Sequence, residues 1–112
     1  MKLSVYVLIL AGVFLAATGQ IAFKLGADGR HALAEFINVW VVLGLLCYGA
    51  GTVLWIFALS KAGLTVVYPF TALTFVLVFL AGIVFFSERV SYAQWGGVAM
   101  ILGGLYLIAV VR

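Results

Sequence analysis

Four long stretches without a charged residue dominate this sequence. They cover residues 3–23, 36–60, 62–87 and 90–111, and they contain 21, 25, 26 and 22 residues. A helix needs about 20 apolar residues to cross a bilayer, so each stretch is long enough. Only helices and closed barrels satisfy the backbone in lipid, and these stretches lack the alternation of a barrel strand. The sequence therefore predicts an all-α membrane protein, a single domain of four transmembrane helices.

The composition excludes most other classes of protein. Hydrophobic residues make up 68% of the 112 residues and charged residues 8%, whereas about a quarter of a soluble domain is charged. The net charge of +3 is too small and too scattered for a nucleic-acid footprint. Cys47 and His31 are the single residues of their types, so no disulfide or metal-site spacing exists. We also find no catalytic motif and expect a protein without enzymatic activity, cofactor, metal or nucleic-acid partner.

The short joints between the stretches leave the orientation in the membrane open. Joints at 60–63 and 87–91 force neighbouring helices to lie antiparallel. Each side of the membrane receives three positive side chains, Lys2, Lys61 and Arg112 on the side of the N-terminus and Lys24, Arg30 and Arg89 on the other. The positive-inside rule then favours neither orientation. Either a partner or the first helix decides the topology, or copies insert in both directions and pair antiparallel.

Two polar residues lie near the end of the first stretch. Gln20 and Lys24 are four residues apart, so they share one face of a helix. An amide is costly in lipid unless it finds a hydrogen-bonding partner. The pair either packs against another helix and reaches the membrane surface, or it presents an amide and an ammonium group to a polar head group.

Pro69 predicts a break in the third stretch. Proline has no N–H to donate to the carbonyl four residues earlier, and its ring pushes on that carbonyl. Tyr68, Thr71 and Thr74 follow one another at spacings of three and form a stripe. This stripe either lines a cavity, where a broken turn is tolerated, or bonds back to its own helix. Trp55 lies deeper than a tryptophan at the membrane interface, which is compatible with a place facing the same cavity.

Glycines repeat after seven residues in the fourth stretch. These glycines are Gly96, Gly97, Gly103 and Gly104. Positions seven apart lie almost on one line of a helix, and glycine there lets another backbone come close. We therefore expect this stretch to be a helix-contact surface and a dimer seam. In the second stretch, Gly44, Gly49 and Gly51 suit close packing or flexing along a cavity.

The order and spacing of these motifs resemble the small multidrug resistance proteins and the EamA-type members of the drug/metabolite transporter superfamily. The segment ATGQIAFK at 17–24 is similar to their helix 1, and YPFTALTFV at 68–76 is similar to their helix 3. ERVS at 88–91, followed by QWGG at 94–97, resembles their last joint and helix 4. The resemblance implies a small multidrug resistance-like bundle. The multidrug exporters, however, carry a proton- and cation-binding glutamate where this chain has Ala16.

The closer resemblance is to the flippase subunits for 4-amino-4-deoxy-L-arabinose linked to undecaprenyl phosphate. It rests on the Gly-Gln and Lys of helix 1, on Tyr-Pro, and on the Glu-x-Val-Ser joint. It implies transport of a lipid-linked sugar across the bacterial inner membrane, for lipid A modification. It also implies paired small subunits, either a homodimer, parallel or antiparallel, or a heterodimer with a similar small subunit.

A polyprenyl-phosphate-linked sugar needs hydrogen-bonding groups and a cation along its path, while its tail stays among the membrane lipids. The expected substrate-binding residues are therefore Gln20, Lys24, Arg30, Tyr68, Thr71 and Thr74. Two alternatives stay open. One is an exporter of small or aromatic cations, with Glu35 or Glu88 as its proton site. The other is an accessory membrane subunit that only stabilises a partner.

Overall fold

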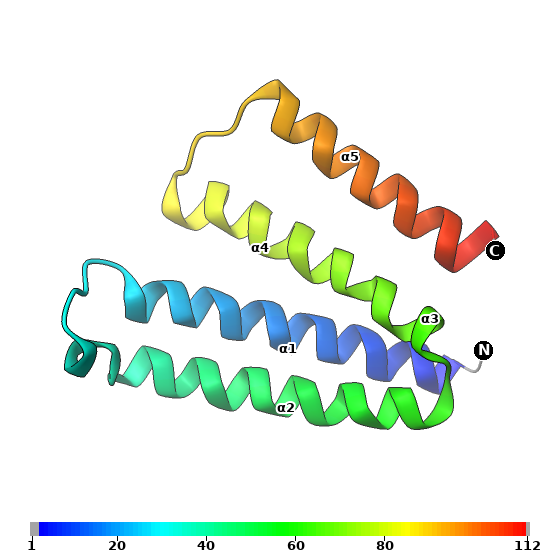
Figure 1. The fold of residues 1–112 in the computed structure, drawn as a ribbon, viewed down its shortest axis with the longest axis horizontal. Helices are drawn as coiled ribbons and strands as arrows, with labels where there is room; N and C mark the ends of the chain where they lie inside the picture. Colours follow the sequence, from blue (N-terminus) through cyan, green and yellow to red (C-terminus); the bar gives the residue numbers. More distant parts are fainter. Residues whose placement is uncertain (1–2, 112) are drawn as a thin grey trace.

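The computed structural model describes residues 3–111 and consists of helices joined by short turns (Figure 1). Four helical segments are long and apolar enough to cross a membrane, namely Leu3–Ala27, Val39–Lys61, Leu64–Phe86 and Tyr92–Val111. The predicted all-α class with four transmembrane helices is therefore confirmed. Of the six positive side chains counted for the orientation, Lys2 and Arg112 lie outside the described residues.

The four segments contain several distinct helical elements. The first two are α1 (Leu3–Ala27) and α2 (Val39–Lys61), which are joined through the 3-10 turn η1 (Leu33–Phe36). The third segment consists of α3 (Leu64–Val67), the 3-10 turn η2 (Tyr68–Phe70) and α4 (Thr71–Phe86). The fourth consists of α5 (Tyr92–Tyr106) and a terminal π-helical turn, η3 (Leu107–Val111). The interruption of the third segment falls at Pro69, which has no N–H to continue the α-helical hydrogen bonds.

Side-chain caps determine where α2 and α5 begin. Asn38 accepts hydrogen bonds from the backbone N–H groups of Trp40 and Val41, and its amide donates to the carbonyl of Gly26. Asn38 thus ties the start of α2 to the end of α1. At the start of α5, Ser91 and Gln94 form a reciprocal capping box. These caps satisfy N–H groups that a helix leaves without an intrahelical partner.

Helices α1 and α2 form a tight antiparallel pair, and glycines lie at their points of closest approach. A methyl group at Gly19 would lie 2.9 Å from the carbonyl oxygen of Gly44, and one at Gly51 would lie 3.0 Å from that of Gly12. At Gly26, a methyl group would lie 2.6 Å from the Val41 side chain. The glycines of α1 are spaced by seven residues, as are the two opposite them on α2. The backbones approach closely because no Cβ separates them.

The glycines predicted to form a helix contact in α5 behave differently. A methyl group at Gly96, Gly97, Gly103 or Gly104 would meet no described atom within 4 Å. Helix α5 lies on the outer side of α4, and α1 lies between α2 and α4 (Figure 1). Within one chain, these four glycines therefore make no helix contact, and their role in a dimer stays a prediction. Their regular spacing marks a smooth face, but it does not say what covers that face.

The buried core lies near the first turns of α1. It consists of Val5, Ile9, Val13, Ala58 and Val67, from α1, α2 and α3. Towards the other end of the bundle, α4 diverges from the α1–α2 pair, and polar residues line the space between them. The fold therefore anchors three helices at one end and leaves room between them at mid-depth.

Candidate substrate cavity

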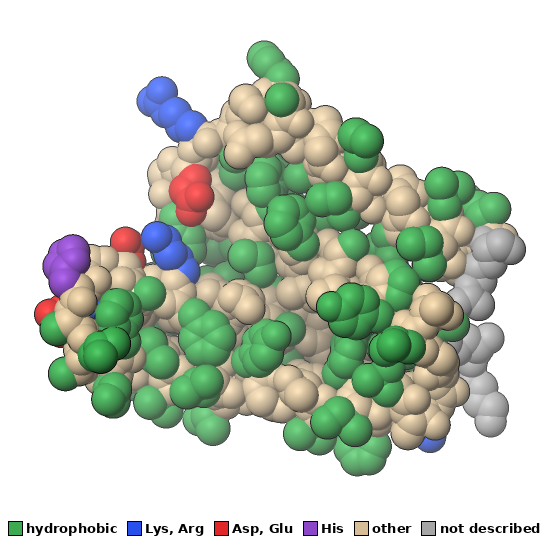
Figure 2. Space-filling model, in the orientation of Figure 1, with side chains coloured by type: hydrophobic (Ala, Val, Ile, Leu, Met, Phe, Trp, Pro, Cys, Tyr) green, Lys and Arg blue, Asp and Glu red, His purple; other side chains and the backbone are tan. Residues whose placement is uncertain are grey.

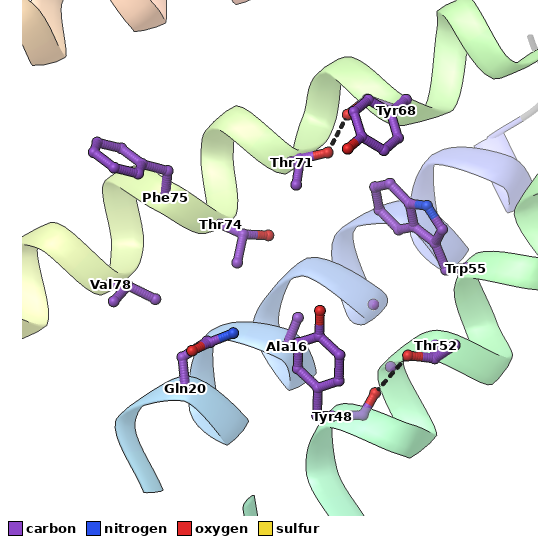
Figure 3. A pocket seen from close by; sticks show the side chains of 12 residues that line it. Ala16, Gln20, Tyr48, Thr52, Trp55, Tyr68, Thr71, Thr74, Phe75 and Val78 are labelled. Atoms are coloured by element: carbon purple, nitrogen blue, oxygen red, sulfur yellow. Dashed lines mark hydrogen bonds between the residues drawn. The ribbon is translucent and has the colours of Figure 1, made fainter. Parts of the chain in front are cut away.

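A cavity of about 460 Å³ opens between α1, α2 and α4 (Figure 3). Each of these helices contributes side chains with polar atoms or aromatic rings. They are Gln20 of α1, Tyr48, Thr52 and Trp55 of α2, and Tyr68, Thr71 and Thr74 of the third segment. The volume falls in the range of ordinary ligand pockets, about 300–1,000 Å³.

Four of the six predicted substrate-binding residues meet in this cavity. Gln20 reaches it from α1, and Tyr68, Thr71 and Thr74 reach it from the opposite wall. The hydroxyl of Thr71 donates to the carbonyl of Tyr68, so Thr71 both bonds back to its own helix and lines the cavity. Neither the Gln20 amide nor the Thr74 hydroxyl hydrogen-bonds to a described residue. Both groups are therefore available to a ligand.

The break at Pro69 brings this stripe to the cavity. Because Tyr68–Phe70 form a tighter 3-10 turn, the residues before it are rotated relative to α4. The carbonyl of Tyr68 accepts hydrogen bonds from both the hydroxyl and the backbone N–H of Thr71, which fixes the end of this turn at the start of α4. In this turn the Tyr68 ring lies opposite Trp55, on the cavity side of the third segment (Figure 3).

Tyr48 and Thr52 are cavity residues that the sequence did not single out. Both come from α2, and the Thr52 hydroxyl donates to the Tyr48 carbonyl at 2.9 Å. Together with Trp55 they follow spacings of four and three along one face of α2. These residues lie next to the packing glycines of the same helix. A polar or aromatic stripe beside such glycines is the sequence pattern that could have identified Tyr48 and Thr52 as cavity residues. Ala16, at the position of the exporters' glutamate, also lines the cavity and adds only a methyl group.

A second cavity of about 460 Å³ continues from the first towards the α1–α2 loop. The two cavities share Gln20, Phe75 and Val78 in their walls, so they adjoin each other, and we refer to the two adjoining cavities as the path. Lys24 lines the second cavity, and its side chain is 50% exposed. Its Nζ lies 3.6 Å from Oδ1 of Asp28 and 6.0 Å from the centre of the Phe86 ring. The path thus leads from hydroxyl and amide groups to an ammonium group.

Arg30, the sixth predicted residue, lies outside this path. It follows the end of α1, where its backbone N–H donates to the carbonyl of Ala27, and it lines neither cavity. Charged side chains do gather at this end of the molecule, while the middle of the same face is hydrophobic (Figure 2). The structure therefore brings together five of the six predicted residues and leaves Arg30 in the loop.

An apolar groove of about 270 Å³ also lies between α1 and α4. It is lined by Phe14 and Thr18 of α1 and by Leu80 and Val84 of α4, among other residues. The groove shares Ile21 and Ala81 with the second cavity. These two side chains, from α1 and α4, therefore separate the path from the apolar groove.

Comparison with known proteins agrees with these features. The chain is similar to proteins named as probable 4-amino-4-deoxy-L-arabinose-phosphoundecaprenol flippase subunit ArnE. The relative in Escherichia fergusonii is 38% identical over 104 residues, which cover 91% of this chain and 93% of the relative. The relative in Pectobacterium atrosepticum is 35% identical over 108 residues, which cover 92% and 96%.

No solved structure matches this chain. The model of the EamA-like transporter family matches residues 1–110, almost the full length of the sequence. With four helices that can span a bilayer, this match leads to one conclusion: the chain is a multi-pass membrane protein and belongs to the EamA-like transporter family.

Proposed function

We propose that this chain is a subunit of a flippase that moves an undecaprenyl-phosphate-linked amino sugar across the bacterial inner membrane. All four helices act as one transmembrane unit in this proposal. The observation that carries it is the path of two adjoining cavities, which runs from uncharged polar groups at mid-depth to Lys24 at the end of the bundle. The names of the relatives point to the same class of substrate.

The path suits a head group that carries a phosphate and a sugar. The Lys24 ammonium group can exchange its contact with Asp28 for the phosphate at the membrane surface. Further along, the Gln20 amide and the Thr74 hydroxyl offer hydrogen bonds to sugar hydroxyls, which replace those lost from water. The head group can then cross without leaving buried polar atoms unpaired.

The apolar groove supports the same proposal because the substrate has an isoprenoid tail. A flippase carries only the head group past the hydrocarbon core, and the tail stays in lipid. The groove borders the path through Ile21 and Ala81, so tail and head group can occupy neighbouring spaces on one seam. In contrast, Ala16 provides no carboxylate for a cation or a coupling proton at mid-depth.

We further propose that the subunit pairs with a second copy or with a similar small subunit through α5. This helix has one buried residue, Val98, and a methyl group at any of its four glycines would meet no described atom of another element within 4 Å. Glycine faces of this kind suit close helix pairing in membranes. The even distribution of positive charges is compatible with a parallel or an antiparallel pair.

Ligand-dependent thermal stability tests the proposed substrate. Purified protein in mild detergent is heated with undecaprenyl phosphate, with its glycosylated form, or with tetraphenylphosphonium, a quaternary aromatic cation. A ligand that binds only the folded protein stabilises it by about 2.7 kcal/mol at one hundred times its dissociation constant. We expect stabilisation by the two phosphate lipids. Selective stabilisation by the cation contradicts the proposal, and a lack of binding without another chain favours an accessory subunit.

Lys24→Gln tests the phosphate contact. A hydrogen bond to a charged group contributes about 1.5–3 kcal/mol, and half-exposure of Lys24 reduces this value, so we expect roughly tenfold weaker binding of undecaprenyl phosphate. Arg89→Gln is the matched control because it removes the same charge at the same end of the bundle, and Arg89 lines neither cavity. Equal affinities of the two variants contradict the role of Lys24.

A further inference from the structure

The chain after α4 turns so that Glu88 lies back on the last turn of that helix. Ser87 adopts the left-handed conformation, with φ of 54°, and the Gly82 carbonyl accepts hydrogen bonds from the backbone N–H groups of Ser87 and Glu88. The Glu88 carboxylate then lies over Gly82, with Oε2 3.2 Å from where a Cβ would be. The absence of a side chain at Gly82 therefore gives the carboxylate its place in the second cavity.

This carboxylate has no cation of its own. The one ion pair among residues 3–111 joins Lys24 to Asp28, and Glu88 makes no side-chain hydrogen bond to a described residue. It also lies at the C-terminal end of α4, where the helix dipole is negative and disfavours an anion. Glu88 is exposed, so water solvates its carboxylate, and an incoming cation has no ion pair of the chain to displace there.

The second cavity therefore carries two opposite charges that do not neutralise each other. Lys24 comes from the end of α1, and Glu88 comes from the joint between α4 and α5. Gln20 lies on the same wall as Lys24 and connects this cavity to the first. Two such groups complement a ligand that carries a phosphate at one position and an ammonium group at another.

We propose that Glu88 is a specificity-determining residue that binds an ammonium group on the sugar while Lys24 binds the phosphate. This inference rests on the proposed function and deepens it, because it makes the site selective for a zwitterionic head group over one with a neutral sugar. Selection arises because a neutral sugar leaves the Glu88 carboxylate without a charged partner, whereas an amino sugar supplies one.

The test compares three lipids on the purified full-length protein in mild detergent. They are undecaprenyl phosphate, undecaprenyl phosphate linked to arabinose, and undecaprenyl phosphate linked to 4-amino-4-deoxy-arabinose. We expect the wild-type protein to bind the amino form about tenfold more tightly than the arabinose form, as a charge-assisted hydrogen bond provides. In Glu88→Gln the two affinities become equal within about twofold, and the affinity for undecaprenyl phosphate is unchanged.

Glu35→Gln is the matched control, since it removes a carboxylate at the same end of the bundle and Glu35 lines neither cavity. It should keep the preference for the amino form. A fourth lipid, in which the amine is acetylated, tests the charge without any substitution in the protein. The wild-type protein should bind this lipid as weakly as the arabinose form. A preference that survives Glu88→Gln, or an acetylated lipid that binds as tightly as the amine, overturns the inference.

The same experiment separates this inference from the proposed function. If the wild-type protein binds none of the phosphate lipids, the proposed function fails, and the role of Glu88 fails with it. If it binds all of them with equal affinity, the flippase proposal stands and the role of Glu88 is refuted. Tighter binding of the amino form by wild type and Glu35→Gln, but not by Glu88→Gln, supports both.

Discussion

The glycine contact between α1 and α2 yields a quantitative prediction at Gly19. In Gly19→Ala the new methyl group would lie 2.9 Å from the carbonyl oxygen of Gly44 and 3.0 Å from Cβ and N of Tyr48. Ordinary van der Waals contact begins at 3.4 Å, so the overlap is about 0.5 Å, and two of these atoms belong to the backbone. The clash therefore requires the two helices to move apart, because no side chain can rotate away to relieve it.

The expected cost follows from this displacement. A gap of about 0.5 Å removes roughly a quarter of the dispersion energy of the atoms that line it, and overpacking in a well-packed interior costs about 1–3 kcal/mol. The equilibrium constant for unfolding should then rise about 5- to 150-fold. Because Tyr48 lines the candidate substrate cavity, binding of the phosphate lipids should weaken as well.

The assay is equilibrium unfolding by SDS in mild detergent micelles, followed by circular dichroism. Gly49→Ala provides the matched control, because it introduces the same methyl group into the same helix pair at a position with no neighbour within 4 Å. That variant should be neutral or slightly stabilising, since alanine favours helix over glycine. If the two variants unfold with the same free energy, the reasoning from close backbone contact is wrong.

Two further predictions concern the break in the third segment and the open face of α5. Pro69→Ala should let the 3-10 turn become α-helical, which rotates Tyr68 by roughly 60° relative to α4. Circular dichroism should show no loss of helix, while binding of the lipid-linked sugar weakens roughly fivefold, and unchanged binding would show that the break does not position Tyr68. Gly103→Leu should leave unfolding of the single chain unchanged, because Gly103 is exposed and a Cβ there would meet no described atom within 4 Å, but it should raise the dimer dissociation constant about tenfold. Energy transfer between labelled copies measures this constant, and an unaltered dimer would argue against α5 as the seam.

The sequence alone determined the membrane class and the four helices, because each depends on local properties. A bilayer requires about 20 consecutive apolar residues, and that requirement can be read from each stretch without knowing its neighbours. The interruption at Pro69 is equally local, since it follows from one missing N–H. For the same reason the stripe of Tyr68, Thr71 and Thr74 could be recognised before its surroundings were known.

Tertiary structure decided which faces meet. The glycine repeat at Gly96 and Gly103 was recognised, yet within residues 3–111 a methyl group there would meet no other helix, whereas Gly12 and Gly19 pack against α2. A repeat marks a smooth helix face, but what covers it depends on how the helices are arranged in space. Lys24 and Arg30 are both positively charged and lie six residues apart. Lys24 lies within α1 and lines the second cavity, whereas Arg30 follows the end of α1 at Ala27 and lies outside it. The carboxylate of Glu88 lines the same cavity because it lies over Gly82, which has no side chain. No local sequence pattern predicts this contact.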